Sequence, residues 1–387
     1  MLTLLIRFAL RNTLRHRLRS SLTILGIVVA ILAFGLLRTV VSAWYAGADA
    51  ASDKRLVVRS SISLIFPLPL SYAEKLRAID GVTQVGKMNW FNGVYIDERN
   101  FFAQFAVDPE THFQLYPENI VPPDEMRAFL NDRRGVIVGR KLANRFGWKI
   151  GDVVPIKGTI YPGNWEFVVR GIYSGRHANT DESQFIFRWD YLNERVQQLY
   201  PGRGNQVGIY LLQIRDGREA AAISRRVDAE FKNSLAETLT ETEKAFNLGF
   251  IAMTGAIVNA IQIVSFVVIV IIMAVMANTM AMAARERGPE YATLKALGFS
   301  PLVVGALVYA ESLLLALIGG GIGILATAPA ARLVGSKLDN IFPVFNVAPE
   351  TLWMQIAAAG VIGVTAAIIP AARAMRMRII DGLRAVV

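Results

Sequence analysis

The longest uncharged stretch of the chain constrains its fold most strongly. From Phe250 to Ala283, thirty-four consecutive residues carry no charge. As one helix they would reach about 51 Å, whereas the hydrocarbon core of a bilayer is roughly 30 Å thick. Because polar side chains interrupt the first half of the stretch, we expect a membrane span at 263–283 and a helical stalk at 234–262 that projects from the membrane.

The composition indicates several such spans. Hydrophobic residues make up 53% of the 387 residues and charged residues only 19%, with a positive mean hydropathy. An average soluble protein is more polar than this. Three further apolar runs, at 20–41, 300–327 and 351–369, are expected to cross the membrane. The first of them could instead be a cleaved signal peptide, although its basic lead and its apolar core are both long for one.

The positive charges lie beside these apolar runs. The net charge is +10, and nine of these ten charges lie in three short pieces: +5 in residues 1–21, +1 in 284–300 and +3 in 371–387. This distribution follows the positive-inside rule, so we place the three pieces in the cytoplasm and exclude a nucleic-acid-binding patch. The connections 42–262 and 328–350 then lie outside the cell membrane.

The connection 42–262 is expected to hold a folded domain. Up to about Lys244 it contains no long apolar run, and short β-rich runs such as Val136 to Gly139 alternate with helical stretches such as Lys141 to Phe146. The predicted fold class is therefore an α-helical membrane protein with four transmembrane helices plus an α+β extracytoplasmic domain.

The cytoplasmic connection 284–299, which we call the elbow, carries the start and stop signals of a short helix. Pro289 suits the first helical position, and Glu290 lies where the helix dipole favours an acid. Lys295 falls in the last turn, and Gly298 can end the helix in a left-handed conformation. The elbow is therefore predicted to be helical.

An apolar stripe lies along this predicted helix. Tyr291, Leu294 and Leu297 recur three residues apart, flanked by charges. Such a stripe is too small to anchor a domain but is sufficient to fill a groove on a partner, with Glu290 beside it. The same residues equally fit an ordinary loop between two membrane helices.

The two ends of the chain are basic. Residues 1–19 are predicted to form an interfacial amphipathic helix, because Arg7, Arg11 and Arg15 recur four residues apart. The face of a soluble helix is the alternative. Residues 370–387, which begin at Pro370, are predicted to form a cytoplasmic tail.

One acid lies deep in the third expected span. Glu311 is ten residues into that span, about 15 Å along the helix and therefore near the middle of the bilayer. An acid at this depth is a functional candidate because its charge is costly there. A structural partner or a water-lined groove would explain it equally well.

Catalytic motifs are absent from the sequence. It contains no Gly-rich phosphate loop ending in Lys-Ser or Lys-Thr, no His-Glu-x-x-His and no Gly-x-Ser-x-Gly. No cysteine is present, and His16, His112 and His177 are too scattered to suggest a metal site. We therefore expect no catalytic residue, no metal and no bound cofactor in this chain, and no ATP binding by the chain alone.

Several motifs match those of a known family. In the elbow the matching residues are Glu286, Arg287, Glu290, Tyr291, Ala292, Ala296, Leu297 and Gly298. Others lie at Leu18 to Ile27, at 370–373 with Leu383 and Arg384, and at 135–143 with Gly151 and Asp152. In motifs and in the order of its parts, the chain resembles the MacB/FtsX-type ABC transporter permeases of the mechanotransmission class, such as LolC/LolE and DevC-type subunits. It departs from them at Gly288 and Pro289, which replace a usual Thr-Arg, and at 380–382.

The resemblance implies a permease subunit that is not an enzyme. It would transmit ATP-driven motion of a separate ATPase to its periplasmic domain and so export or extract a lipid, lipoprotein, peptide or amphiphilic drug. The implied partners are an ABC ATPase that binds ATP and Mg, a second permease copy as a homodimer or a close relative, a periplasmic adaptor, an outer-membrane channel and membrane lipids. The implied location is the bacterial inner membrane, with both termini cytoplasmic.

The resemblance also assigns roles to the elbow. The residues expected to couple to the ATPase are Glu286, Arg287, Pro289, Glu290, Tyr291, Leu294, Lys295, Leu297 and Gly298. Of these, Glu290, Tyr291, Leu294 and Leu297 are expected to form the contact face. An FtsX-like regulator that activates a cell-wall hydrolase without transporting anything is the alternative function. A membrane-anchored enzyme is disfavoured by the missing catalytic motifs.

Overall fold

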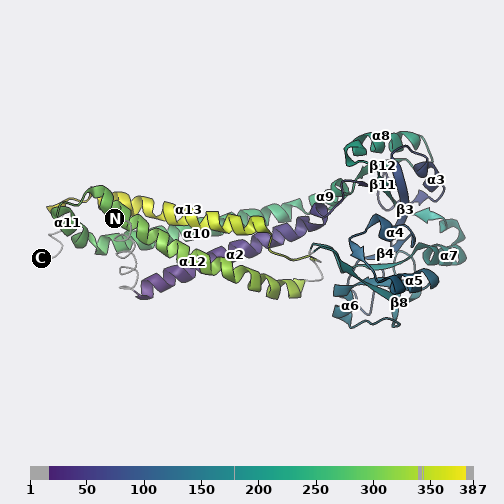
Figure 1. Ribbon diagram of the computed structural model, residues 1–387, viewed down its shortest axis with the longest axis horizontal. Helices are drawn as coiled ribbons and strands as arrows, with labels where there is room; N and C mark the ends of the chain where they lie inside the picture. Colours follow the sequence, from purple (N-terminus) through teal and green to yellow (C-terminus); the bar gives the residue numbers. More distant parts are fainter. Residues whose placement is uncertain (1–16, 178, 339–341, 343, 381–387) are drawn as a thin grey trace. The chain divides into compact units, whose positions relative to one another are not determined.

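A computed structural model describes residues 17–177, 179–338, 342 and 344–380 (Figure 1). The chain divides into two compact units. The first, here the helical unit, comprises residues 1–42, 254–337 and 345–387, and the second, here the α/β unit, comprises 43–253 and 338–344. Residues 1–16 of the amphipathic helix expected at 1–19, and residues 381–387 of the tail expected at 370–387, fall outside the described residues.

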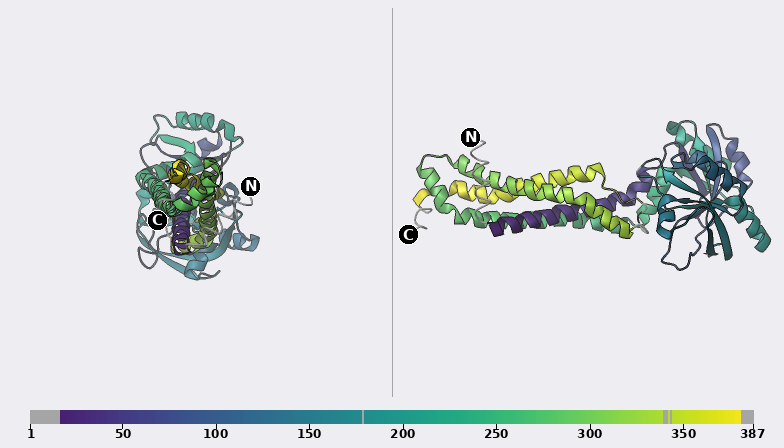
Figure 2. Two further views of the ribbon diagram at one scale, coloured as in Figure 1. Left: turned by 90° about the vertical axis from the view of Figure 1, so that its left-hand side faces the viewer. Right: turned by 60° about the horizontal axis from the view of Figure 1, so that its bottom comes forward.

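Four of the described helices are long and apolar enough to cross a membrane. They are α2 (Arg17–Asp49), α10 (Gly255–Glu286), α12 (Pro301–Leu338) and α13 (Pro349–Arg376), and the short helix α11 (Gly288–Ala296) connects α10 to α12. Figures 1 and 2 show the four long helices side by side, with α11 at one end of the bundle. The expected four-helix membrane architecture is thus confirmed.

The helices end at other residues than expected. Helix α12 continues past 327 through Pro329 to Leu338, so the connection expected at 328–350 is shorter. Helix α13 likewise continues through Pro370, which was expected to open the tail. The helix continues because a proline inside a membrane helix is tolerated among neighbouring helices, and Pro370 is buried in the bundle.

The stalk expected at 234–262 is also shorter than predicted. Thr238–Thr242 forms strand β12, which pairs with β1 (Arg55–Ser60), and only then does helix α9 (Glu243–Met253) begin. Alternating threonines favour an extended strand over a helix. Helix α9 ends at Met253, so Thr254 separates it from the membrane helix α10.

Glycines allow two of the long helices to approach closely. A Cβ atom added to Gly319 of α12 would lie 2.7 Å from Cβ of Ile27 in α2, and one added to Gly323 would lie 3.0 Å from Cβ of Ile31. Side chains at these positions would therefore force α12 away from α2. Small residues at helix contacts let backbones approach in the same way throughout membrane proteins.

A single amide joins three helices inside the bundle. Nε2 of Gln355 in α13 donates a hydrogen bond to the main-chain oxygen of Ile31 in α2, at 2.9 Å, and another to Oγ1 of Thr327 in α12, at 2.8 Å. Gly35 makes room for it, since a Cβ there would lie 2.2 Å from Nε2. Gln355 is fully buried.

The α/β unit is built on one large mixed sheet. Among the described residues ten strands form it, in the order β12-β1-β11-β3-β4-β9-β6-β8-β5 with β7 paired to β8. Its remaining strands are β3 (Val82–Trp90), β4 (Gln104–Val107), β5 (Asn119–Ile120), β6 (Gly135–Gly139), β7 (Val153–Gly158), β8 (Gly163–Gly175), β9 (Phe185–Arg188) and β11 (Ile209–Ile214). Strands β2 (Leu68–Pro69) and β10 (Gln206–Val207) form a separate pair.

Helices cover both faces of this sheet. They are α3 (Tyr72–Arg77), α4 (His112–Leu115), α5 (Pro123–Asn131), α6 (Arg140–Phe146), α7 (Trp189–Leu199) and α8 (Ala220–Glu230). In β9, Phe185 and Phe187 enter the core under α3, α6, α7 and α8, whereas Ile186 enters the core under α5. Successive side chains of a strand point to opposite faces, so a strand buried on both sides is apolar throughout.

Candidate coupling site

The elbow helix α11 begins and ends as its residues predict. Pro289 lies in the first turn, where a missing N–H costs nothing. At the other end Gly298 adopts a left-handed φ of +92°. The N–H of Phe299 then reaches the oxygen of Leu294 at 3.1 Å, and the N–H of Gly298 that of Lys295 at 3.0 Å. This pair of bonds is the Schellman motif, which satisfies carbonyls at a helix end.

An ion pair ties the start of α2 to the end of α10. The guanidinium of Arg19 donates to both carboxylate oxygens of Glu286, at 2.7 and 2.5 Å. Both side chains are partly exposed, and the two-pronged geometry is the strongest form of such a pair. The contact joins residues 267 positions apart in the sequence.

A buried ion pair ties α11 to α12. Arg287, between α10 and α11, donates from Nη1 to a carboxylate oxygen of Glu311, and the two side chains are only 5% and 6% exposed. Tyr291, 5% exposed, lies against both charges in the bundle core. Burial and the negative charge of Glu311 raise the pKa of Tyr291 to about 12, so its hydroxyl remains neutral. Glu311, which the sequence indicated as a functional candidate, thus has a charged partner at the start of α11.

A lysine ties α11 to the end of α13. Nζ of Lys295 donates to the main-chain oxygens of Ala374, Met375 and Met377, at 3.0, 2.9 and 2.8 Å. The last carbonyls of a helix have no partner within the helix and carry partial negative charge. A single ammonium group satisfies three acceptors there, so Lys295 fixes α11 to this end of α13.

These contacts gather all four long helices around the elbow. We call Arg19, Glu286, Arg287, Lys295 and Glu311 the elbow cluster. It joins α2 to α10, α11 to α12 and α11 to α13, while the chain itself joins α10 to α11. The elbow cluster therefore connects α11 and all four long helices of the unit.

The outer side of the elbow presents a different set of residues. Glu290 and Thr293 are exposed. Leu297, Phe299 and Leu302 follow with 71%, 44% and 76% of their surfaces exposed. Three large apolar side chains exposed within six residues form a patch that a partner or a membrane surface would cover.

The structure separates the residues predicted for coupling into three groups. Glu286, Arg287, Tyr291, Leu294 and Lys295 face the bundle, Pro289 and Gly298 shape the helix, and only Glu290 and Leu297 face outward. The expected contact face is corrected for Tyr291 and Leu294, since both pack against the bundle core. The sequence could not show this, because an apolar stripe packs equally well on its own bundle or on a partner.

Other members of the site had no sequence signal for their place in it. Phe299 and Leu302 lie beyond the helix that the motif defines, and the family motif that contains Arg19 indicated only the entry into the first span. The partners of Lys295 are main-chain oxygens, which every residue type supplies. Only the depth of Glu311 indicated that a partner was required.

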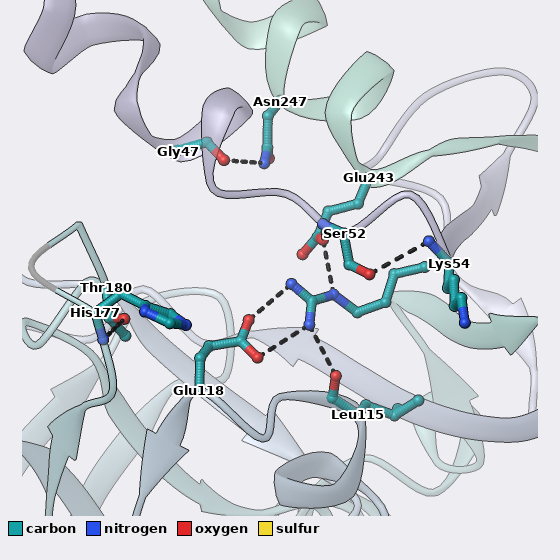
Figure 3. A network of polar contacts seen from close by, with 10 residues as sticks. Gly47, Ser52, Lys54, Leu115, Glu118, His177, Thr180, Glu243 and Asn247 are labelled. Carbon is teal, nitrogen blue, oxygen red and sulfur yellow. Dashed lines mark hydrogen bonds and ion pairs between the residues drawn. The ribbon is translucent and has the colours of Figure 1, made fainter. Parts of the chain in front are cut away.

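A second charged network lies in the α/β unit, where the last turns of α2 and the start of α9 meet the sheet (Figure 3). Arg55 is 4% exposed and donates to Glu243 at 2.7 Å, to Glu118 at 2.7 Å and to the main-chain oxygen of Leu115 at 2.9 Å. Nearby, Asn247 of α9 donates to the main-chain oxygen of Gly47 in α2 at 3.1 Å. One guanidinium therefore joins β1, α9 and the loop after α4.

Two uncharged rings surround this guanidinium. Arg55 lies 4.3 Å from the ring centroid of Tyr116. Burial, followed by the nearby Glu243, raises the pKa of Tyr116 well above its ordinary value. His112 is buried, and burial together with the charge of Arg55 lowers its pKa to about 3. His112 is thus neutral at physiological pH.

No group of three or more residues suited to hold a metal ion occurs in the described part of the chain. The contacts described above connect helices to one another and leave an apolar patch exposed at Leu297, Phe299 and Leu302.

Two family descriptions match most of the chain. The MacB-like periplasmic core domain matches residues 20–230, and the FtsX-like permease C-terminal domain matches residues 262–379. The second match contains the elbow, the elbow cluster except Arg19, helices α12 and α13, and α10 from residue 262 onward.

Individual proteins are similar over comparable ranges. An uncharacterized ABC transporter permease of Methanocaldococcus jannaschii is 24% identical, covering 98% of this chain and 97% of its own. An uncharacterized ABC transporter permease protein of Mycobacterium tuberculosis is 26% identical over 65% of this chain and 29% of its own. Among solved structures, the periplasmic region of MacB from Actinobacillus actinomycetemcomitans is 10% identical, with a TM-score of 0.37, over 52% of this chain and 94% of its own.

The fold and the site define a four-helix membrane protein with a mixed α/β domain between its first two membrane helices and a charged elbow between the second and third. The chain belongs to the MacB/FtsX-type ABC transporter permeases.

The buried pair Arg287–Glu311 gives a prediction on stability. Glu311→Leu or Arg287→Met alone leaves one buried charge unpaired and should cost about 3–5 kcal/mol. The double variant removes both charges and should recover most of that loss. Thermal unfolding of the purified protein in detergent measures this. A double variant as unstable as the two single losses added together would contradict the pairing.

His112 gives a prediction on pH. An unfolded histidine titrates near 6.5, whereas the pKa of folded His112 is about 3. Between these values the unfolded chain binds a proton that the folded chain does not, so stability should fall as the pH falls, by up to about 1.4 kcal/mol per pH unit. The thermal midpoint of His112→Phe should depend less on pH between 7 and 4.5. Equal acid sensitivity in both proteins would refute this role.

Proposed function

We propose that this permease transmits ATP-driven motion of a separate ABC ATPase to its α/β unit, and thereby exports or extracts a lipid, lipoprotein, peptide or amphiphilic drug. The ATP and Mg would be bound by the ATPase, and this chain would contribute no catalytic residue. The elbow cluster carries the proposal, because it ties an exposed short helix to every long helix of the bundle.

The outer side of the elbow would dock on the ATPase. Leu297, Phe299 and Leu302 supply exposed apolar surface, and Glu290 adds a charge beside it. A short amphipathic helix laid into a groove is a recurring mode of recognition. When ATP draws two ATPase subunits together, the displaced α11 would move the long helices with it.

The remaining partners belong to the same proposal. A second permease copy, identical or closely related, would place a second elbow on the second ATPase subunit. We further propose a bacterial inner-membrane location with both termini cytoplasmic, and a periplasmic adaptor with an outer-membrane channel. Positive charges flanking the apolar runs support this orientation.

The match to an FtsX-like permease domain favours one alternative. In it the same motion would activate a cell-wall hydrolase and transport nothing. Reconstituted permease and ATPase in vesicles separate the two functions: ATP-dependent release of a labelled amphiphile supports transport. ATP-dependent activation of a bound hydrolase without such release supports the regulator.

The coupling proposal predicts the effect of changing the outer face. Glu290→Ala with Leu297→Ala should weaken the complex with the ATPase about tenfold or more, because exposed apolar anchors dominate such interfaces. The complex is purified in mild detergent through the permease, and retained ATPase and ATP hydrolysis are measured. The thermal midpoint of the permease alone shows whether the double variant remains folded.

Leu325→Ala provides the matched control, since Leu325 on α12 is also exposed, at 79%, but lies away from the elbow. It should leave the retained ATPase unchanged. Full ATPase retention and stimulation by the Glu290 and Leu297 double variant would refute docking through this face.

The proposed orientation is tested by labelling. The chain has no cysteine, so single cysteines can be placed at Leu235, which is 94% exposed in the α/β unit, and at Thr293, which is exposed on α11. In intact cells a membrane-impermeant thiol reagent should label Leu235→Cys and not Thr293→Cys. Labelling of Thr293→Cys alone would reverse the assignment.

A further inference from the structure

A groove lies between the ends of α10 and α13 in the helical unit. Its volume is about 560 Å³, within the range of about 300–1,000 Å³ common for small-molecule sites. Among its lining residues are Ala281, Ala284 and Arg285 of α10, and Ile369, Arg373 and Arg376 of α13. None of these six belongs to the elbow cluster.

Along both walls of the groove, apolar residues come before arginines in the direction of the chain. On α10, Ala281 is followed one helical turn later by Arg285, and on α13, Ile369 is followed one turn later by Arg373. Apolar surface therefore lies deeper along both helices and guanidinium groups lie nearer their carboxyl ends. Ile369 is 57% exposed, so its side chain offers free apolar surface there.

Three arginines lie at the basic end of the groove. Within residues 17–177, 179–338, 342 and 344–380, none of the three arginines has a carboxylate within ion-pair distance. Arginine forms paired hydrogen bonds with phosphate and carboxylate groups. The amino-terminal residues 1–19 carry five arginines and no acid, so charge repulsion opposes their occupying this groove.

We propose that the groove binds one anionic phospholipid of the cytoplasmic leaflet. Its phosphate would lie among Arg285, Arg373 and Arg376, and an acyl chain would cover Ile369 and the alanines of α10. An acidic segment of a protein would pair with the arginines but would leave the apolar floor in the hydrocarbon region unused. A zwitterionic lipid would use the floor but lacks the net charge.

The site lies beside the elbow cluster. Met377 lines the groove and its main-chain oxygen accepts a hydrogen bond from Lys295. A bound lipid would thus stabilise the end of α13 on which α11 is fixed. The proposal depends on the cytoplasmic position of the elbow but not on ATP-driven coupling, and its test needs no ATPase, so the two proposals can fail separately.

The test measures lipid binding to the full-length permease in detergent. Purified protein is titrated with dioleoyl phosphatidylglycerol or dioleoyl phosphatidylcholine, and bound lipid is counted by native mass spectrometry. We expect one tightly bound phosphatidylglycerol and no comparable phosphatidylcholine. Because each arginine near a membrane surface changes affinity several-fold, Arg373→Gln with Arg376→Gln should weaken the tight site roughly 30-fold.

Two further variants distinguish the parts of the site. Arg378→Gln removes an exposed arginine two residues beyond Arg376 that does not line the groove, and it should leave the tight site unchanged. Ala281→Phe keeps all three arginines but fills the apolar floor, and it should abolish tight binding. Inorganic phosphate in excess should not displace the lipid.

Several results would overturn the proposal. They are equal binding of the two lipids, tight binding retained by the Arg373 and Arg376 double variant or by Ala281→Phe, and displacement by inorganic phosphate. If the double variant does not fold, Arg285→Gln on the other wall replaces it. Loss of the preference for phosphatidylglycerol then supports the site, and retention contradicts it.

Discussion

The buried ion pair between Arg287 and Glu311 is the contact on which the elbow depends. Removing two charges from water is costly, and the cost is recovered only while the two remain paired. Helix α11 therefore cannot leave α12 without exposing an uncompensated charge to an apolar bundle. Lys295 adds a similar constraint at α13, where it satisfies three carbonyls at once. Arg287 and Lys295 of the elbow motif thus connect α11 to α12 and to α13.

Much of the architecture follows from the sequence for simple physical reasons. Long uncharged runs require a membrane, and their number and flanking charges define four spans. Where each helix ends does not follow, because a proline such as Pro370 looks like a stop in isolation but is tolerated among neighbouring helices. Strand β12 was missed although its alternating threonines favour an extended strand, because its partner β1 lies about 180 residues away in the sequence.

The sequence located the elbow helix but did not show which side of that helix faces the bundle. Helix signals and the positions of Glu290 and Lys295 defined α11, but an apolar stripe does not state which neighbour covers it. Tyr291 is buried in the bundle core and Leu297 is exposed, although both lie on one predicted stripe. The network around Arg55 was missed because it joins residues 188 and 63 positions apart that follow no shared pattern.

The amide of Gln355 limits the motions open to the bundle. Its two hydrogen bonds reach α2 and α12 from α13, and the side chain is fully buried between these helices. Sliding α13 by one helical turn, about 5.4 Å, would break both bonds together and would carry the side chain away from the space that Gly35 leaves for it. Tilting the helices about this point preserves the bonds. The register of the three helices is thereby locked, and changes of tilt are the motions that cost least.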